Sequence, residues 1–395
     1  MRLGYLIPEF PGQTHIFFWR EAQALHRLGF EVEWYSTRRP LQPCRHRFAE
    51  KLAAQTLYVF PPKLTPTLRF LMRHPSFLFH GLTYLASLPD THLTRKLQLT
   101  GLIFCAAYLC ADMKAKGITH IHAHSCGDAA HLLAIASFAP GVSYSLSLHG
   151  DLPVYGTAHQ AKFARARFVA VVTALLQLQV KEFCHLPQDR LPLIRMGVDT
   201  QRFVPKPQSP RTVFELITVA RLVACKGHRF ALEALAVLRR EGFKLRYTIV
   251  GDGEFKAEIE ADIQRLSLQN DVRMLGTASE EQVIAALQEA DAFILPSVGF
   301  GEAAPVSVME AMSCGLPVIS SLIGGTPELI TDGHDGFLVA QGDSSAIRRA
   351  LLRLLQDEEL RGLLGRQARE TAVQKFASEL FARRFAELLV PKDSL

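Results

Sequence analysis

The chain has 395 residues, enough for two or three domains, and its 48% hydrophobic and 21% charged residues exclude a disordered chain. The net charge of +6 is uneven: residues 1–200 hold 21 Lys and Arg against 12 Asp and Glu, whereas residues 201–395 hold 23 against 26. The basic first half favours an anionic membrane surface or an anionic acceptor as partner, although ordinary solvated charge explains it equally well.

The seven cysteines are dispersed, odd in number and without a CxxC pair. This usage predicts reduced thiols in a cytosolic protein, and neither a disulfide framework nor a zinc ribbon. The start MRLGYLIPEF is too short an apolar run for a signal peptide, and no stretch reaches the roughly 18–20 apolar residues of a membrane span. We therefore expect a cytoplasmic protein that is soluble or at most peripheral at the inner face of the membrane.

An α/β pattern opens the chain. Residues 3–7 predict a buried strand, residues 14–28 a helix that ends at Gly29, and residues 30–35 a second strand. The loop between strand and helix contains Gly12 but lacks the three-glycine dinucleotide fingerprint, which disfavours a nicotinamide site.

Residues 36–117 are less regular and begin with a basic cluster. Two apolar segments, 77–88 and 99–113, read as helices that are too short or too interrupted to span a bilayer. They are either core-facing helices of the first domain or an amphipathic pair that lies on a membrane beside a lipid-linked acceptor. The cluster consists of Arg38, Arg39, Arg45, Arg47 and Lys51.

Histidines mark two of the next predicted strands. Residues 118–124 place His120, His122 and His124 on one face of a strand, because strand side chains alternate. No acidic or cysteine ligand with recognisable spacing completes a zinc set, so we expect polar residues that face a cleft. Residues 143–148 form a strand that runs into His149 and thus places an imidazole at the carboxyl edge of the sheet.

Three further elements complete the first half: a strand at 166–173, a helix at 175–183 and a strand at 193–198. The proline-bearing segment 205–211 then reads as a stiff linker between domains.

The second half repeats the alternation of strand, loop and helix. A strand at 214–219 leads into a loop that carries Arg221 and Lys226, followed by a helix at 228–239. Cations in such a loop suit a diphosphate, since arginine offers a planar fork and lysine a mobile point charge, although both could simply be exposed residues at a helix start. A strand at 247–250 ends in Gly251-x-Gly253, and another follows at 272–275.

Residues 292–328 are the stretch around which the chain is organised. A strand at 292–295 is followed by a glycine-containing loop, a helix from Pro305 and a strand at 317–321. Such a loop lies at the carboxyl edge of a parallel sheet, where the N-terminus of the helix attracts phosphate. Glu302 and Glu310 could accept hydrogen bonds from a sugar diol, or Glu302 could cap the helix while Glu310 faces solvent. The residues alone leave this open.

A family resemblance decides between these readings. Glu302 and Glu310 have seven residues between them and precede AMSCGLPVIS and Gly324-Gly325-x-x-Glu328. The pattern resembles the Glu-x7-Glu signature of retaining glycosyltransferases of family 4 (glycosyl transferases group 1). Ala303 replaces the glycine of many members, a variant found in bacterial exopolysaccharide and lipopolysaccharide enzymes. The Arg221–Gly227 and Gly251–Gly253 loops fall in the order that the family shows.

The resemblance implies the GT-B fold, an α/β architecture with two Rossmann-like domains facing each other across a cleft and a C-terminal helix, 379–389, that crosses back to the first. We expect an acceptor domain at 1–204, the linker at 205–211, a donor domain at 212–376 and the crossing segment at 377–395. The Val198-Asp199 segment resembles a family element that closes the first domain, which implies an architectural role for it. A last strand at 336–339 precedes helices from 344 to 390.

The resemblance also implies the site. Arg221 and Lys226 would stabilise the departing diphosphate, Glu302 and His149 would position the sugar, and Glu310 would hold the ribose. The expected catalytic residues are His149, Arg221, Lys226 and Glu302. The expected donor-binding residues are Gly12, Gly251, Gly253, Leu275, Ala303, Ala304, Pro305, Val306 and Glu310.

The expected reaction moves a sugar, with retention, from a nucleotide diphosphate sugar to a hydroxyl of a glycan or lipid-linked glycan in cell-surface polysaccharide biosynthesis. No metal-binding DxD motif lies in a suitable loop, so we expect no cofactor, no metal and no nucleic acid partner. A nucleotide-sugar 2-epimerase of the same fold and a non-catalytic nucleotide-sugar or glycan-binding protein are the alternatives. Donor, base and acceptor are not specified by the sequence.

Overall fold

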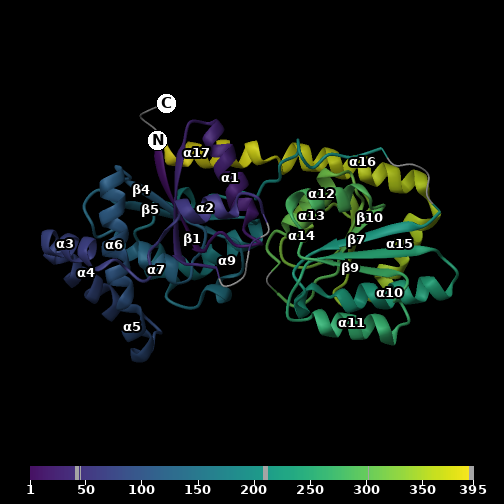
Figure 1. Cartoon of the computed structure of the whole chain (residues 1–395), viewed down its shortest axis with the longest axis horizontal. Helices are drawn as coiled ribbons and strands as arrows, with labels where there is room; N and C mark the ends of the chain where they lie inside the picture. The colour runs from purple at the N-terminus through teal and green to yellow at the C-terminus, as the bar shows by residue number, and fades with distance from the viewer. Residues whose placement is uncertain (41–43, 45, 208–211, 301, 391–395) are drawn as a thin grey trace. The chain divides into compact units, whose positions relative to one another are not determined.

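The chain folds into two compact units, which we describe separately (Figure 1). The computed structural model describes residues 1–40, 44, 46–207, 212–300 and 302–390. One unit comprises Met1–Arg195 with Ala382–Leu395, and the other comprises Met196–Phe381. Each is built on its own six-stranded parallel sheet, so the predicted two-domain α/β class is confirmed. The finer domain limits stay predictions, and residues 208–211 of the expected linker lie outside the described residues.

The sheet of the first unit has the order β3-β2-β1-β4-β5-β6. Chain order reverses between β1 and β4, so the loops after these two strands diverge at a topological switch point, where such sheets bind ligands. Residues such as Leu3, Leu6 and Ile121 are fully buried, since helices cover both faces of a parallel sheet. The strands are β1 (Arg2–Glu9), β2 (Glu31–Arg38), β3 (Leu57–Tyr58), β4 (His120–Ala123), β5 (Ser143–Leu148) and β6 (Val169–Val171).

Five of the strands predicted in this half are confirmed, but the one at 193–198 is wrong. The chain there forms only single bridges, between Val171 and Leu193 and between Val198 and Ala377. The first bridge joins the first unit and the second lies in the second unit, because the chain passes from one unit to the other at Arg195. Residues 193–198 therefore cannot pair along their whole length with either sheet, because they connect the two units.

Helix α6 belongs to the core of the first unit, which decides part of the question left open for residues 77–113. Ala106, Leu109 and Cys110 are buried on it, and it packs against α3 and α7. Helices α3, α4 and α5 lie outside it (Figure 1). None of the helices in the described part of the chain is long and apolar enough to span a membrane. The helices are α1 (Ile16–Arg27), α2 (Ala49–Gln55), α3 (Leu64–Arg73), α4 (Pro75–Ala86), α5 (Leu93–Leu99), α6 (Gly101–Lys116), α7 (Asp128–Ala136), α8 (His159–Phe163) and α9 (Ala174–Cys184).

The sheet of the second unit has the order β12-β11-β10-β7-β8-β9. Its switch point lies between β7 and β10, the two strands that precede the Arg221 loop and the Glu302 loop. The strands predicted in this half are confirmed. They are β7 (Phe214–Val219), β8 (Leu245–Val250), β9 (Val272–Gly276), β10 (Ala292–Leu295), β11 (Val318–Ser321) and β12 (Gly336–Val339). The helices are α10 (His228–Arg240), α11 (Lys256–Arg265), α12 (Glu280–Gln288), α13 (Val306–Ser313), α14 (Thr326–Leu329), α15 (Ser344–Gln356) and α16 (Glu358–Lys375).

Helix α17 (Ser378–Leu389) starts in the second unit and ends in the first, which confirms the predicted crossing helix. Phe385 on it is fully buried, with its ring centroid 4.6 Å from that of His122 and 5.8 Å from that of Phe168. The guanidinium of Arg167 donates to the carbonyl of Leu389 at 3.2 Å. The final helix therefore completes the core of the first unit.

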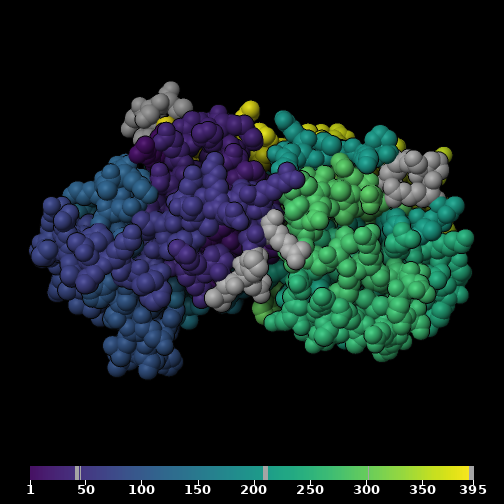
Figure 2. Space-filling view, viewed as in Figure 1, coloured from purple at the N-terminus to yellow at the C-terminus, as the bar shows by residue number. Residues whose placement is uncertain are grey.

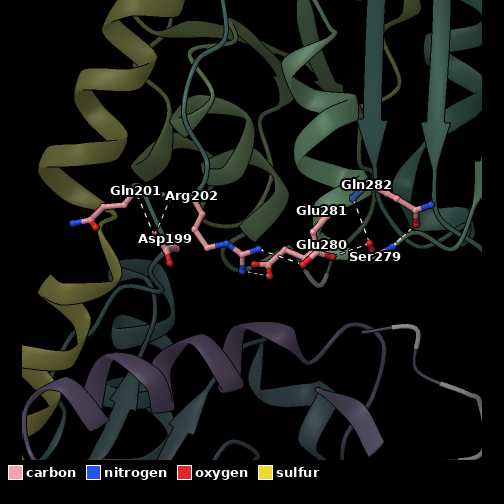
Figure 3. Close-up of polar contacts among 7 residues, drawn as sticks. All are labelled: Asp199, Gln201, Arg202, Ser279, Glu280, Glu281 and Gln282. Atoms are coloured by element: carbon pink, nitrogen blue, oxygen red, sulfur yellow. Dashed lines mark hydrogen bonds and ion pairs between the residues drawn. The ribbon is translucent and has the colours of Figure 1, made fainter. Parts of the chain in front are cut away.

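The segment after Val198 is fastened within the second unit (Figure 3). Asp199 Oδ1 accepts hydrogen bonds from the backbone N–H groups of Gln201 and Arg202, at 3.1 and 3.2 Å. Arg202 in turn pairs with Glu280 and Glu281 at the start of α12. These contacts fit the architectural role expected of this element.

A second fastening comes from Arg369 on α16. Its guanidinium donates to the carbonyl oxygens of Thr200, Phe203 and Ser313 and to Ser313 Oγ, at 2.8–2.9 Å. Ser313 Oγ also donates to the Phe203 carbonyl at 2.7 Å. Arg369 thereby joins the segment that contains Thr200 and Phe203 to helices α13 and α16.

Candidate active site

The predicted donor residues gather on loops at the carboxyl edge of the second sheet, and glycines let these loops approach closely. Added Cβ atoms would lie 1.8 Å from the Ala220 carbonyl oxygen at Gly251 and 2.3 Å from the Leu222 carbonyl oxygen at Gly253. Gly251 also has a φ of +144°, which side chains rarely adopt. The loop after β8 therefore needs glycine at both positions to support the loop that carries the exposed Arg221.

The loop after β7 rests in the same way on the loop after β10. A Cβ at Gly227, whose φ is +65°, would lie 2.0 Å from the Pro296 carbonyl oxygen. The backbone N–H of Val298 donates to the Cys225 carbonyl at 2.8 Å. The two loops at the switch point are thus joined by backbone contacts, which fixes Lys226 relative to Glu302.

Lys226 and Glu302 form an ion pair at this junction. The side chain of Glu302 is 6% exposed and that of Lys226 is 16% exposed, and Ser297 Oγ donates to Glu302 Oε1 at 2.8 Å. A buried ion pair contributes little net stability, because desolvation offsets the attraction. The pair lies at the carboxyl edge of the parallel sheet, where such sheets bind ligands, which makes it a candidate functional group.

The backbone at Gly324 and Gly325 contacts the backbone carbonyl of Glu302. A Cβ at Gly324 would lie 1.8 Å from the Glu302 carbonyl oxygen, and the N–H of Gly325 donates to that oxygen at 3.1 Å. The glycine pair after β11 is therefore a support for the Glu302 backbone.

Helix α13 begins directly beyond these contacts. Ala303, Ala304 and Pro305 lead into it, and Pro305 is its N-cap residue, one position before the first-turn position that we predicted. Among the described residues no side-chain cap forms at Pro305, so N–H groups of the first turn, beginning with Val306, can bind an anion.

Glu310 lies on α13 and is 6% exposed, which excludes the reading in which it faces solvent. It is near Cys314, whose thiol pKa rises to about 12 through burial and the nearby Glu310 charge.

Leu275 lies near the end of β9, next to Gly276, whose carbonyl accepts a hydrogen bond from the Gly251 N–H at 2.9 Å. Leu275 lines a cavity of about 540 Å³ on the face of the sheet, together with Ile217, Arg246, Thr248 and Arg273. None of the residues that line this cavity belongs to the loops that carry Arg221, Lys226 or Glu302.

Gly12 and His149 lie on loops at the carboxyl edge of the first sheet. A Cβ at Gly12 would meet His15 Nδ1 at 2.7 Å, and this nitrogen is itself 2.7 Å from the Glu9 carbonyl oxygen. Burial, aided by the charge of His15, lowers the pKa of His149 to about 3. The His149 imidazole is therefore neutral at neutral pH.

His149 is held by groups that the sequence did not reveal as its partners. Its Nε2 lies 3.2 Å from His124 Nδ1, and its backbone N–H donates to the Tyr155 hydroxyl at 3.0 Å. His124 Nε2 lies 3.7 Å from a carboxylate oxygen of Glu21, whose pKa burial raises well above its ordinary value.

The two histidines within β4, His120 and His122, do not face a cleft, and that expectation is wrong for them. His120 and His122 are buried, and each ring nitrogen lies 2.7–2.9 Å from a serine hydroxyl of β5, on Ser143, Ser145 or Ser147. They stabilise the sheet internally, since their hydrogen bonds are all satisfied. Among the described residues, no cluster of His, Cys, Asp or Glu is suited to hold a metal ion.

Sequence reasoning missed Ser297, and it placed His124 on a cleft-facing strand without revealing its contact with His149. Ser297 follows the end of β10 by two residues, so its position at the carboxyl edge was a usable signal. The contact of His124 with His149 joins two separate strands, and no local pattern indicates it.

Comparison with known proteins identifies the family. The profile described as Glycosyl transferases group 1 matches residues 199–371. The Escherichia coli (strain K12) protein named "Putative colanic acid biosynthesis glycosyltransferase WcaL" is 30% identical over 409 residues, which span 98% of this chain and 99% of that protein. The chain belongs to the glycosyl transferases group 1 family. A second relative of this glycosyltransferase, the amylovoran biosynthesis glycosyltransferase AmsK of Erwinia amylovora, is 27% identical over 98% of this chain and 99% of its own length.

Solved structures show that this glycosyltransferase has the GT-B fold. The crystal structure of Anabaena Alr3699/HepE in complex with UDP superposes with a TM-score of 0.73 at 19% identity and covers 100% of both chains. The fold expected from the Glu-x7-Glu resemblance is thereby confirmed.

Proposed function

We propose that this glycosyltransferase moves a sugar from a nucleotide diphosphate sugar to a hydroxyl of a glycan or lipid-linked glycan, with retention of the anomeric configuration, as a family 4 enzyme. The observation that carries the proposal is the buried Lys226–Glu302 pair beside the uncapped N-terminus of α13. Full-length similarity to glycosyltransferases of colanic acid and amylovoran biosynthesis supports a role in cell-surface polysaccharide biosynthesis. The Anabaena protein was crystallised with UDP and with UDP-glucose, which supports a nucleotide-sugar donor.

In this mechanism the bond between the anomeric carbon and the diphosphate oxygen breaks, and negative charge develops on the diphosphate. Arg221, Lys226 and the N–H groups at the start of α13 stabilise that charge, in a setting fixed before the reaction. The acceptor hydroxyl attacks from the face that the diphosphate leaves, and its proton passes to the departing phosphate oxygen.

The remaining residues bind and orient. Glu302 positions the sugar while it fixes Lys226, and Glu310 accepts hydrogen bonds from the ribose diol. His149, as a neutral imidazole, can donate one hydrogen bond and accept another, which suits a sugar hydroxyl. Gly12 leaves room for the ligand at the turn after β1, as the family resemblance implies.

Cations of the protein take the place that a metal holds in other transferases, so we propose a metal-independent reaction. We further propose that the enzyme works in the cytoplasm, peripherally at the inner face of the membrane, where a lipid-linked acceptor is presented. Release of nucleoside diphosphate should then be the same with and without EDTA.

The test is release of free nucleoside diphosphate from a panel of UDP-, GDP- and ADP-sugars, with and without an extract of lipid-linked glycans. Lys226→Ala and Glu302→Ala should lower acceptor-stimulated release by about 100-fold or more, as expected for groups that stabilise a transition state. Lys256→Ala, on the exposed start of α11, is the matched control and should leave release unchanged. The anomeric configuration of the product, read from its NMR coupling, tests retention.

Two outcomes would overturn the proposal. Conversion of the donor sugar without any acceptor would establish an epimerase. Tight donor binding without turnover, unaltered by Lys226→Ala, would establish a binding protein.

A further inference from the structure

The outer helices of the first unit carry an unusual number of exposed apolar side chains. Nine large apolar residues are exposed between residues 64 and 104: Leu64, Leu68, Met72, Leu78, Phe79, Leu82, Leu93, Leu97 and Phe104. The next largest group of exposed apolar residues among the described residues of this unit lies between residues 154 and 183 and has four members. We call the nine residues of the first group the outer apolar surface. Isolated exposed apolar residues need no explanation, but a concentration of this size indicates a binding surface.

The exposed residues follow the helices in regular stripes. Leu64, Leu68 and Met72 recur every four residues on α3 and therefore lie on one side of it, while Thr67 and Phe70 face the interior. The inward faces of α3, α4 and α5 are satisfied by packing among themselves and against the buried helix α6. The apolar side chains on their outward faces remain 39–76% exposed, and these helices lie at the surface of the first unit (Figures 1 and 2).

The charged side chains around the outer apolar surface are mainly basic. Residues 60–104 contain five Lys and Arg residues, and Asp90 is their one acidic residue. Lys63, Arg69 and Arg73 are exposed, and none of them forms an ion pair with another described residue. Arg95 pairs with Asp128 of α7, so it contributes less free charge. Leucine and phenylalanine interleaved with unpaired basic residues are typical of helices that lie in the interface of an anionic bilayer.

We propose that the outer faces of α3, α4 and α5 form a surface that binds an anionic lipid bilayer. Lys63, Arg69 and Arg73 attract the phosphate headgroups, and Met72, Phe79 and Leu97, which are 76%, 66% and 62% exposed, enter the boundary between headgroups and acyl chains. The proposal differs from the amphipathic pair that the sequence suggested, because α6 is mostly buried apart from Phe104, and α3 and α5 take its place.

This membrane-binding surface deepens the proposed function, because a lipid-linked acceptor would be presented at the same membrane. It rests on the proposed function in that respect alone. Binding to vesicles needs no sugar transfer. A failure to bind would therefore leave the transferase proposal intact, and a failure of transfer would leave the surface intact.

The test is cosedimentation of the full chain with vesicles of phosphatidylglycerol and phosphatidylethanolamine, and with vesicles of phosphatidylcholine alone, at low and high salt. The wild-type protein should bind the anionic vesicles, with lower affinity at high salt, and should not bind the neutral vesicles. Phe79→Glu and Leu97→Glu should each lower the affinity by about 10- to 100-fold, from lost apolar burial and added repulsion.

Matched controls lie on α9 of the same unit. Phe183 and Leu178 are each 63% exposed, so Phe183→Glu and Leu178→Glu should retain the binding of wild type. Tryptophan fluorescence of each variant verifies that the first unit is folded. Absence of binding to anionic vesicles would overturn the proposal, as would equal losses in the α9 variants. Self-association of wild type that Phe79→Glu abolishes would also overturn it, by assigning the surface to a second copy of the chain.

Discussion

Replacing His120 with glutamine should make the first unit less sensitive to acid. His120 is 2% exposed, and burial, aided by the charge of Arg167, lowers its pKa to about 3. Unfolded histidine has a pKa of about 6.5, so below that pH the unfolded chain binds a proton that the folded chain excludes. The stability that neutral His120 provides is therefore complete above pH 6.5 and is lost as the pH falls toward 3.

The size of the effect follows from this difference in pKa. Between the two values, each such histidine lowers the free energy of unfolding by about 1.4 kcal/mol per pH unit, or about 2 kcal/mol at pH 5. Burial also lowers the pKa values of His122 and His124 well below 6.5, so these residues act in the same direction. Glu21 acts in the opposite direction, since its raised pKa favours the folded state in acid.

The assay is urea unfolding at pH 8 and at pH 5, followed by tryptophan fluorescence. Both tryptophans of the chain, Trp19 and Trp34, belong to the first unit, so the signal reports that unit alone. His120→Gln should be less stable than wild type at pH 8, because it packs less well, but this deficit should shrink by about 2 kcal/mol at pH 5. The exposed His92→Gln is the control and should follow wild type at both values. The same deficit at pH 8 and pH 5 would refute the reasoning.

Three further substitutions test other parts of the structure. Arg369→Met removes a guanidinium that donates to three carbonyl oxygens and a hydroxyl, and should lower the free energy of unfolding of the second unit by about 2–4 kcal/mol, measured by circular dichroism in urea. Phe385→Ala should cost the first unit about 3–5 kcal/mol, and an unshifted tryptophan transition would contradict its place in that core. Gly324→Ala would force a methyl group against the Glu302 carbonyl and should abolish nucleoside diphosphate release. Gly333→Ala, with a similar positive φ but open space around it, should retain release.

The sequence predicted most of the second unit because its signals are local. Mainly apolar runs of four to six residues form β7, β8, β10 and β11. The loop that follows each run contains glycine or charged residues and belongs to the candidate site. The sequence showed the Gly324-Gly325 motif but not the close approach of Gly324 to Glu302, because that distance depends on how two loops pack.

The first unit was predicted less completely, because its particular features depend on long-range contacts. Nothing near His120 indicates the serines of β5 that bind it, and nothing near His149 indicates His124. Helices α3 and α5 have only ten and seven residues, and no separate helices were predicted there, although apolar residues recur every four positions on α3.

Helix α17 has a consequence for how this enzyme can be taken apart. Because residues from Ala382 onward belong to the first unit, that unit is discontinuous along the chain, and residues 196–381 form an insertion within it. A recombination that exchanges the whole second unit must therefore use two crossover points, near Met196 and near Phe381. A chimera joined only at the first point imports a foreign final helix, and its Phe385 equivalent must fit a core that it did not evolve with.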